Sequence, residues 1–547
     1  MKNWDAQARP FLASARHPAL MAFVIFCLAA CFSDKGKHVV DSGEPDFFTR
    51  EVKGLELVNA SPTVALKDGD TLRLTAAPVK KFLRGQEVRM LAYNGSIPGP
   101  LIKVQEGASI TVLLKNHTGL PTSLHSHGVR MEARFDGTPG ITNSGSLTDP
   151  ILDGGSGVYR LRFPDPGIYW YHSHVREDYS QELGLYGNYW VIPKDTTYWD
   201  PVDREVVLMI DDILMDSGGI AQFRTGTTNH ALMGRFGNLF LVNGDTAFSM
   251  NVKRREVVRF YVTNACNTRV LNLGLDKHII KVMGSDNGRF EMPQLGQFNY
   301  LAPGERIVFE CYFQADGVDG NPDTVQIVHS TPTADIKLGM IHVLPDSSNS
   351  GNGINFWNPD SSAAAVHSID PYRPFFDKAP DEELFLTVRM GGPMAMKSSA
   401  AGKTSATQHD PTGKGIEWED VMGEVNASLT SNDITWIVRD IRTGKENMDI
   451  HWSFKHGDKI KIRIVNDSVA MHPMPHPIHF HGQRFLVTAV NGVHNYVEMG
   501  WKDTYLVGRG ETVDLLLDAD NPGEWMAHCH ISEHLASMMM FGFEVKP

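Results

Sequence analysis

A strand-like pattern recurs three times along this chain, and the repeat is the feature that most constrains its fold. The recurring segments are "ASITVLLKN" (108–116), "REVVRFYVTN" (255–264) and "DKIKIRIVN" (458–466), all rich in Val and Ile and ending in asparagine. Turns containing Gly and Pro separate such segments, as in an all-β sandwich. The segments take similar places in successive stretches of about 150 residues, an ordinary domain size. The repeat therefore predicts three copies of one β-sandwich.

The first and last stretches share two further motifs that the middle stretch lacks. "HSHG" (125–128) matches "HFHG" (479–482), and "PGIYWYHSH" (166–174) matches "PGEWMAHCH" (522–530). The second motif follows the first by a similar interval in both stretches. We expect copies one and three to carry metal ligands and copy two to carry none.

The chain has 547 residues, more than one hydrophobic core supports. Loop-like composition between residues 345 and 368 marks a linker into the third copy. The expected organisation is a signal peptide at 1–30, a first sandwich at 44–195, a second at 196–345, a linker at 346–380 and a third sandwich at 381–547.

The N-terminus has the pattern of an export signal. Basic residues precede the apolar run "LMAFVIFCLAA" (20–30), which is too short to span a bilayer. The run ends before Cys31 in a sequence that resembles a bacterial lipoprotein cleavage site, and a plain signal peptide is the alternative. Both predict export to the periplasm or cell surface, with membrane attachment only through a lipid on Cys31.

Charge and cysteine content narrow the function. The formal net charge of -13 argues against nucleic acid as a partner, because no basic surplus is present to neutralise phosphates. The cysteines downstream of Cys31 are Cys266, Cys311 and Cys529. An odd thiol in an oxidising compartment is often protected by a metal. Spacing leaves open whether Cys266 and Cys311 form a disulfide, and we favour buried thiols.

Four His-x-His pairs are the strongest chemical signal. In a strand, residues i and i+2 face the same side, so each pair offers two imidazoles together. Eight imidazoles exceed the ligand number of one ion, which predicts two or three ions shared between copies one and three. The pairs are His125/His127, His172/His174, His479/His481 and His528/His530.

Cys529 must face away from its histidine neighbours, because strand alternation turns it to the opposite side. With His476 and His534 it would form a His₂Cys set with a methionine as weak axial ligand, as in blue-copper sites. Zinc is the alternative metal, although structural zinc sites usually contain CxxC pairs, which this chain lacks. An electron arriving at Cys529 would reach the histidine cluster through a few covalent bonds. This arrangement suits one-electron oxidation of a donor and four-electron reduction of dioxygen.

These motifs resemble those of the three-domain multicopper oxidases, which include laccases, ascorbate oxidase and bacterial cuprous oxidases. The matching motifs are "HSHG", "HSH", "HPIHFHG" and "HCHISEHLASMM", between residues 125 and 539. The resemblance implies three cupredoxin-like Greek-key β-sandwiches, dioxygen as electron acceptor and four copper ions: one type 1, one type 2 and a binuclear type 3 pair.

The family roles transfer onto matching positions of this sequence. His476, Cys529 and His534 match the type 1 ligands, and Met539 matches the axial ligand by its spacing after His534. Its neighbours Met538 and Met540 are more simply explained as core residues. The type 2 ligands match His125 and His479, and the type 3 ligands match His127, His172, His174, His481, His528 and His530.

Asp136, in "RFDGTPG", matches the family's acid that supplies protons to reduced oxygen. The alternative is an ordinary Asp-Gly turn. Several bacterial relatives carry a glutamate directly after the last type 1 histidine, whereas this chain has Leu535. Because leucine cannot transfer a proton, that route is absent here, and more of the proton supply is expected from Asp136.

The resemblance implies Cu(I) or a phenolic compound as the reducing substrate. Thioethers suit Cu(I), and core packing is the alternative role for each methionine. A function from another class, copper sequestration by an exported lipoprotein without turnover, would not need a complete type 2 and type 3 ligand set. The methionines that could bind Cu(I) are Met390, Met394, Met396, Met471 and Met474.

Overall fold

The structure is a computed structural model that describes residues 48–139, 149–314, 324–391, 429–470 and 472–547. The described residues belong to one compact unit, Asp41–Pro547. The predicted signal peptide and Cys31 lie outside the described residues, and so do Met394, Met396 and Met471.

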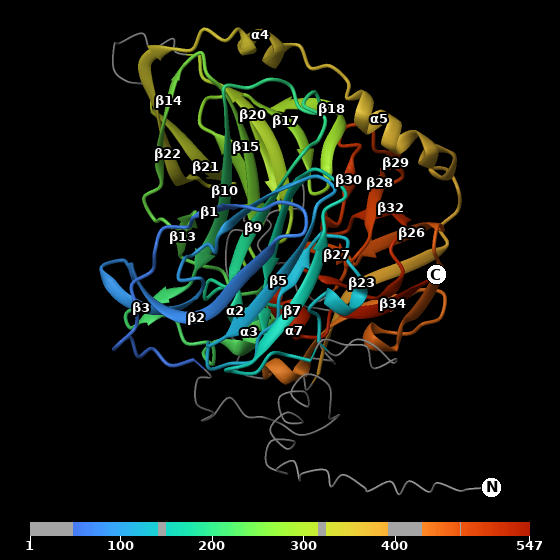
Figure 1. Cartoon of the computed structure of the whole chain (residues 1–547). Helices are drawn as coiled ribbons and strands as arrows, with labels where there is room; N and C mark the ends of the chain where they lie inside the picture. The colour runs from blue at the N-terminus through green and yellow to red at the C-terminus, as the bar shows by residue number, and fades with distance from the viewer. Residues whose placement is uncertain (1–47, 140–148, 315–323, 392–428, 471) are drawn as a thin grey trace, which may run out of the picture. The chain divides into compact units, whose positions relative to one another are not determined.

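The N-terminal strands form one pair of sheets (Figure 1). The five-stranded sheet has the order β1 (Thr63–Ala65), β4 (Leu101–Gln105), β9 (Tyr186–Ile192), β8 (Gly167–His172) and β6 (His125–His127). The four-stranded sheet has the order β3 (Gln86–Tyr93), β2 (Thr71–Leu83), β5 (Ser109–Asn116) and β7 (Ser156–Arg162).

The central strands form a second pair of sheets. The six-stranded sheet has the order β13 (Leu239–Val242), β10 (Arg204–Ile213), β15 (Val257–Asn264), β20 (Arg306–Tyr312), β17 (Ile280–Ser285) and β18 (Gly288–Gly296). The five-stranded sheet has the order β14 (Ser249–Arg254), β22 (Asp335–Ser347), β21 (Thr324–Ser330), β16 (Leu271–Leu275) and β19 (Phe298–Leu301). A separate short hairpin joins β11 (Met215–Asp216) and β12 (Gly219–Ile220).

The C-terminal strands form a third pair. The seven-stranded sheet contains β24 (Ile434–Asp440), β23 (Glu382–Met390), β26 (Lys459–Asn466), β32 (Thr512–Asp518), β28 (Arg484–Val490), β29 (Val493–His494) and β30 (Trp501–Lys502). The five-stranded sheet has the order β25 (His451–Lys455), β34 (Met540–Lys546), β33 (Gly523–Cys529), β27 (His476–Phe480) and β31 (Thr504–Val507).

No sheet within the described ranges takes strands from two of these pairs. The predicted all-β fold is confirmed, and Figure 1 shows the blue-to-cyan, green-to-yellow and orange-to-red strands as separate groups. The exact boundaries of the three sandwiches remain a prediction.

The asparagine that ends each repeated strand has the same role in all three sandwiches. Asn116, Asn264 and Asn466 are buried at the ends of β5, β15 and β26. Each donates its side-chain amide to backbone carbonyls further along the chain: Leu120 and Ile151, Arg269 and Leu301, and Met474, Val507 and Gly508, respectively. Buried backbone carbonyls of this kind need a hydrogen-bond donor. The repeat therefore reflects a shared structural requirement.

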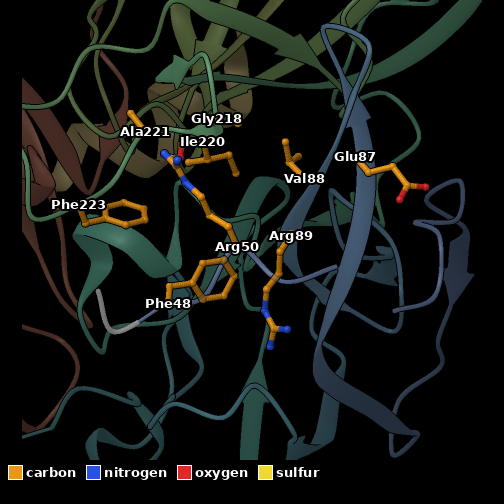
Figure 2. A pocket seen from close by; sticks show the side chains of 10 residues that line it. Phe48, Arg50, Glu87, Val88, Arg89, Gly218, Ile220, Ala221 and Phe223 are labelled. Carbon is orange, nitrogen blue, oxygen red and sulfur yellow. Dashed lines mark hydrogen bonds between the residues drawn. The ribbon is translucent and has the colours of Figure 1, made fainter. Parts of the chain in front are cut away.

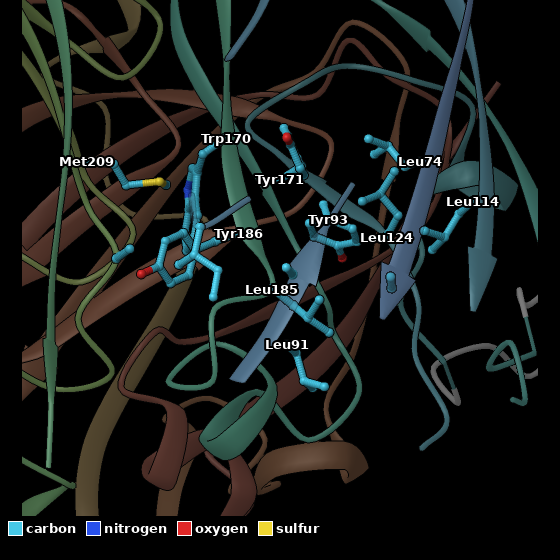
Figure 3. Close-up of a cluster of buried hydrophobic side chains, with 14 of the residues drawn as sticks. Leu74, Leu91, Tyr93, Leu114, Leu124, Trp170, Tyr171, Leu185, Tyr186 and Met209 are labelled. Atoms are coloured by element: carbon cyan, nitrogen blue, oxygen red, sulfur yellow. The ribbon is translucent and has the colours of Figure 1, made fainter. Parts of the chain in front are cut away.

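The core of the first sandwich supports the strand that carries His172 (Figure 3). Alternation along β8 turns Tyr171 to one face, where its hydroxyl donates to the carbonyl of Pro100. Trp170 and His172 face the other side, with stacked rings 4.2 Å apart. Packing of the aromatic residues thus fixes the orientation of a candidate ligand.

Helices are few and short in the part of the chain described. The α-helices are α2 (Glu177–Ser180), α3 (Thr227–Met233), α4 (Asn352–Trp357), α5 (Ala363–Ile369) and α7 (Ser532–Ala536). The 3₁₀ helices are η1 (Ala133–Phe135), η2 (Asp370–Phe375), η4 (Ser431–Asp433) and η5 (Asn447–Asp449). None of the helices in the described ranges is long and apolar enough to cross a membrane.

The predicted linker differs from expectation because it is partly helical. The sequence indicates a loop, whereas α4, α5 and η2 lie between residues 352 and 375. The Ser362 hydroxyl accepts a hydrogen bond from the amide of Ala365, which caps α5 ahead of an alanine run with high helix propensity. Composition alone concealed this local capping signal.

Cys266 and Cys311 are free thiols, and both side chains are fully buried. Cys266 follows β15, and Cys311 lies within β20. The favoured interpretation of buried thiols is confirmed, and the alternative of a disulfide is wrong.

Replacing Asn264 by alanine tests the role of the repeated asparagine in the copy without candidate ligands. Two buried carbonyls would lose their donor, so we expect the free energy of unfolding to fall by about 2 kcal/mol. Denaturant unfolding measures this change. Asn358→Ala is the control, because Asn358 is exposed although it donates to the carbonyl of Ile354. Equal stabilities of the two variants would contradict the proposed role.

Candidate metal centres

Cys529 converges with two histidines on one point. Its Sγ lies 3.6 Å from Nδ1 of His476 and 3.7 Å from Nδ1 of His534. Antiparallel pairing of β27 with β33 places Ile478 opposite Cys529, and α7 returns His534 to the same place. All three side chains are buried. The predicted His₂Cys set is therefore assembled.

The outer side of this set is covered by residues from elsewhere in the chain. Nε2 of His534 lies 3.3 Å from the carbonyl oxygen of Leu232 in α3, which leaves Nδ1 facing Cys529. The Trp436 ring lies 4.1 Å from the His534 ring, and its Nε1 donates to the carbonyl of Ala231. Met539 is fully buried, and its carbonyl accepts from the amide of Cys529. This hydrogen bond places the backbone of Met539 beside the backbone of Cys529.

The other eight candidate ligand histidines form one buried cluster from the first and third sandwiches. Strand register brings them together, because His125 pairs with His172 across β6 and β8 while His479 pairs with His528 across β27 and β33. In each of three groups of histidines, one ring nitrogen per residue lies within 4.8 Å of the others. These groups are His125/His479/His481, His125/His127/His172 and His174/His481/His528. Rings of His127 and His530 are 5.0 Å apart, which adds the eighth imidazole.

Most of these rings have one nitrogen held by the protein and the other free. Nδ1 of His125, His172, His479 and His528 bonds to backbone carbonyls of Asp136, Ser173, Asp503 and Cys529, respectively. Within this cluster, the buried ring nitrogens without a hydrogen-bond partner among the described residues are His125 Nε2, His127 Nδ1, His172 Nε2, His174 Nε2, His479 Nε2 and both ring nitrogens of His530. Buried polar atoms rarely lack partners, so the free nitrogens indicate ligands for a metal.

Asp136 contacts the cluster directly. Its Oδ2 accepts from Nδ1 of His481 at 2.8 Å and from the hydroxyl of Thr138 at 2.6 Å. Its Oδ1 lies 3.2 Å from Nδ1 of His125, but that nitrogen is directed at the Asp136 carbonyl instead. The predicted proximity to the histidines is thus present, and Asp136 orients His481 with Nε2 inward.

Burial keeps several of the candidate ligand side chains uncharged in the absence of metal. It lowers the pKa of His127, His172 and His479 well below the usual value, and neighbouring imidazoles lower it further. The pKa of His528 falls to about 4 through burial. Neutral imidazoles can accept a cation. Burial raises the pKa of the Cys529 thiol, so a metal must displace its proton.

The sequence did not identify several residues that complete the cluster. Asp503 and Thr504 contact His127 Nε2 at 3.0 and 2.9 Å, and Arg306 pairs with Asp503. Oε1 of Glu177 lies 3.0 Å from Nε2 of His174. The only available signal was that Glu177 follows His174 by three residues, whereas the others lie far away in sequence.

The donor set fits copper. A thiolate with two imidazoles suits copper's preference for soft and nitrogen ligands, and the buried free nitrogens offer sites for further ions. The carboxyl groups of Asp136, Glu177 and Asp503 lie beside histidines of the cluster. Neither feature resembles the closed four-ligand shell of structural zinc.

The small cavity in Figure 2 is not part of these centres. It holds about 20 Å³ and is lined by residues such as Phe48, Arg50 and Phe223, none of them histidine or cysteine. A larger cavity of about 210 Å³ lies between β18 and β31, with Glu305, Arg306 and Lys502 in its wall. It thus adjoins the surroundings of the cluster.

Sequence comparisons agree with this geometry. Two profiles described as multicopper oxidase match residues 75–196 and 424–547. The chain is 26% identical to the iron transport multicopper oxidase FET3 of Gibberella zeae, with 84% of this chain and 73% of the relative covered. It is 25% identical to the multicopper oxidase MmcO of Mycobacterium tuberculosis, with 86% of each covered. It is 24% identical to the copper resistance protein A homolog of Pseudomonas syringae, with 86% and 92% covered.

Solved structures share the fold. A multicopper oxidase from Campylobacter jejuni described as a metallo-oxidase has a TM-score of 0.64 at 23% identity, covering 92% of this chain and 100% of that one. McoA from Aquifex aeolicus has a TM-score of 0.64 at 21% identity, covering 90% and 100%. The expected cupredoxin-like fold is confirmed. The chain belongs to the multicopper oxidase family, whose members are copper enzymes that use four copper ions and dioxygen.

Proposed function

We propose that the converging side chains bind the four copper ions in the roles that the sequence predicts. His476, Cys529 and His534, with Met539 as axial ligand, hold the type 1 copper. His125 and His479 hold the type 2 copper. The type 3 pair is held by His127, His172, His174, His481, His528 and His530. The observation that supports metal binding is that ligand atoms lie within 4.8 Å of one another in the His476/Cys529/His534 group and in each of the three histidine groups. The division into copper types follows the matching motifs of the sequence.

Copper at these sites supplies one-electron oxidation of a donor at type 1 and four-electron reduction of dioxygen at the cluster. The protein provides the connection between the sites. Cys529 is bonded to His528 and His530, and its carbonyl accepts a hydrogen bond from Nδ1 of His528 at 2.9 Å. Burial of these residues excludes water from the path. The covalent bonds from Cys529 to His528 and His530 therefore provide a fixed path for electron transfer between the two sites.

Asp136 is proposed to supply protons at the cluster. Its Oδ1 is buried without a hydrogen-bond donor among the described residues, whereas Oδ2 already accepts from His481 and Thr138. A proton held at Oδ1 would lie beside the histidines. The absence of a carboxylate at Leu535 strengthens the need for this residue.

Cu(I) is the preferred of the two proposed donors. The type 1 ligands are buried, and the Leu232 carbonyl with the Trp436 ring covers His534. This cover favours a small donor over a bulky phenol at direct contact with the ligand. Met390 and Met474 are buried in the hydrophobic core, as expected for core packing, so they do not bear on this choice. The relative named as a copper resistance protein supports the same choice.

We also propose that the protein is exported and anchored through a lipid on Cys31. The sequence pattern at residues 20–31 supports this proposal.

Oxygen uptake by the copper-loaded protein tests the function. We expect uptake with Cu(I), and slower uptake with a bulky phenol because of the cover over His534. An oxygen electrode with each donor at equal concentration gives the ratio. Copper binding without uptake for either donor would instead support sequestration.

Cys529→Ser should remove the type 1 copper while leaving the cluster. The hydroxyl is a poor copper ligand compared with a thiolate, so the blue absorbance and donor oxidation should both disappear. Metal analysis should show one copper fewer per chain, with the circular dichroism spectrum unchanged. Retained blue colour would refute the type 1 assignment.

Asp136→Asn should separate proton supply from ligand positioning. The amide oxygen can still accept from His481, so copper content and blue colour should persist. Turnover should fall by about 10²–10⁴-fold, the usual contribution of a proton donor. Steady-state oxygen uptake measures the loss, and Asp136→Glu should restore part of it. Full turnover of Asp136→Asn would exclude the proton role.

A further inference from the structure

A buried arginine from the sandwich without copper ligands reaches the histidine cluster. Arg306 begins β20, and its side chain is completely buried. It donates from both terminal nitrogens to Asp503, with Nη1–Oδ1 and Nη2–Oδ2 distances of 2.6 Å each. The guanidinium fork holds a carboxylate in one orientation through two parallel hydrogen bonds.

Asp503 in turn contacts two ligand histidines. Its Oδ1 lies 3.0 Å from Nε2 of His127, and its backbone carbonyl accepts from Nδ1 of His479 at 2.8 Å. Thr504 Oγ1 lies 2.9 Å from the same His127 nitrogen and 3.1 Å from His479 Nδ1. The contacts leave Nδ1 of His127 and Nε2 of His479 free for metal.

Arg306 also ties the first sandwich to this network. Its Nε donates to the carbonyl of Ile168 at 3.0 Å, in the strand that carries His172. Space for the arginine–aspartate pair depends on Gly128, because an added Cβ there would collide with both Asp503 and Arg306. The final glycine of "HSHG" is thus explained by this contact.

The preceding turn of the middle sandwich approaches the cluster as well. Gly304 has φ +84°, and a Cβ built on it would lie 2.7 Å from the Cδ2 atom of His530. The carbonyl of Gly304 accepts a hydrogen bond from Nη1 of Arg306 at 3.2 Å. The middle sandwich therefore presents one backbone turn and one side chain to the ligands.

Electrostatics make this arginine hard to replace. Asp503 and Asp286 are both fully buried. Nη1 of Arg306 also lies 3.6 Å from Oδ1 of Asp286. Without the guanidinium, two buried carboxylates would face each other with Lys502, 3.5 Å from Asp286, as the remaining cation. An uncompensated buried charge is strongly unfavourable. Asp503 would then change its orientation, and His127 would lose its support.

We propose that Arg306 is a positioning residue for the trinuclear copper cluster, acting through Asp503 on His127 and His479. The middle sandwich thereby controls a metal centre to which it contributes no ligand. The inference rests on the proposed assignment of these histidines as type 3 and type 2 ligands.

Arg306→Met tests the proposal in the copper-loaded full-length protein. We expect the cluster to lose copper affinity by about 10–100-fold, as is usual when a residue supporting a metal ligand is removed. Metal analysis after dialysis and the electron paramagnetic resonance signal of type 2 copper measure the loss. The blue type 1 absorbance should remain and serves as an internal measure of folding.

Two further variants make the test specific. Arg306→Lys retains the charge but not the fork, so it should restore copper retention in part while leaving the type 2 signal altered. Arg259→Met is the matched control, because Arg259 is equally buried in the same sheet and pairs with Glu310 at 2.6 Å. It should lower stability without changing cluster copper or the type 2 signal.

The outcomes distinguish the inference from the assignment on which it rests. Wild-type protein without a type 2 signal would overturn the assignment itself. A normal wild-type signal that persists unchanged in Arg306→Met overturns the inference alone, and so does an equal loss of copper in Arg259→Met. If Arg306→Met fails to fold, an unchanged type 2 signal in Arg306→Lys overturns the inference, and an altered one supports it.

Discussion

The antiparallel pairing of β27 with β33 is the constraint on which both candidate metal centres depend. Its register sets Ile478 opposite Cys529 and His479 opposite His528. Because side chains alternate along a strand, the pairing sends Cys529 toward His476 on one side and gathers His479, His481, His528 and His530 on the other. A slip of one residue would exchange the two faces and separate every ligand set. The two centres therefore cannot be positioned independently of each other.

Charge balance is the second requirement of such a buried cluster. Neutral imidazoles are tolerated in the core without metal, and burial keeps them neutral by lowering their pKa. Metal cations would be costly there unless negative groups lie close. Asp136 meets this need while it orients His481 through a hydrogen bond. Asp503 also orients a histidine, but Arg306 balances its charge. Glu177 places a further carboxyl group beside His174.

Local pattern predicted which candidate ligands lie together, because strand alternation acts between near neighbours. The four His-x-His pairs, the opposite orientation of Cys529 and the repeated asparagines could all be derived this way. Residues that orient the ligands could not, since Asp503 and Arg306 reach His127 from distant parts of the chain. Short helices between residues 352 and 375 were also missed, because a serine cap and an alanine run look like loop composition in a polar segment. Pattern reasoning fails where tertiary contact decides the role.

The middle sandwich gives a physical reason for a copy that carries no candidate ligand. Its turn at Gly304 packs against His530, and α3 covers His534 through the carbonyl of Leu232. One domain thus touches the surroundings of both candidate centres from outside. Without these contacts, the candidate ligands would be held only by the first and third sandwiches. The added contacts from the middle sandwich help to preform the ligand set, which reduces the cost of ordering it around metal.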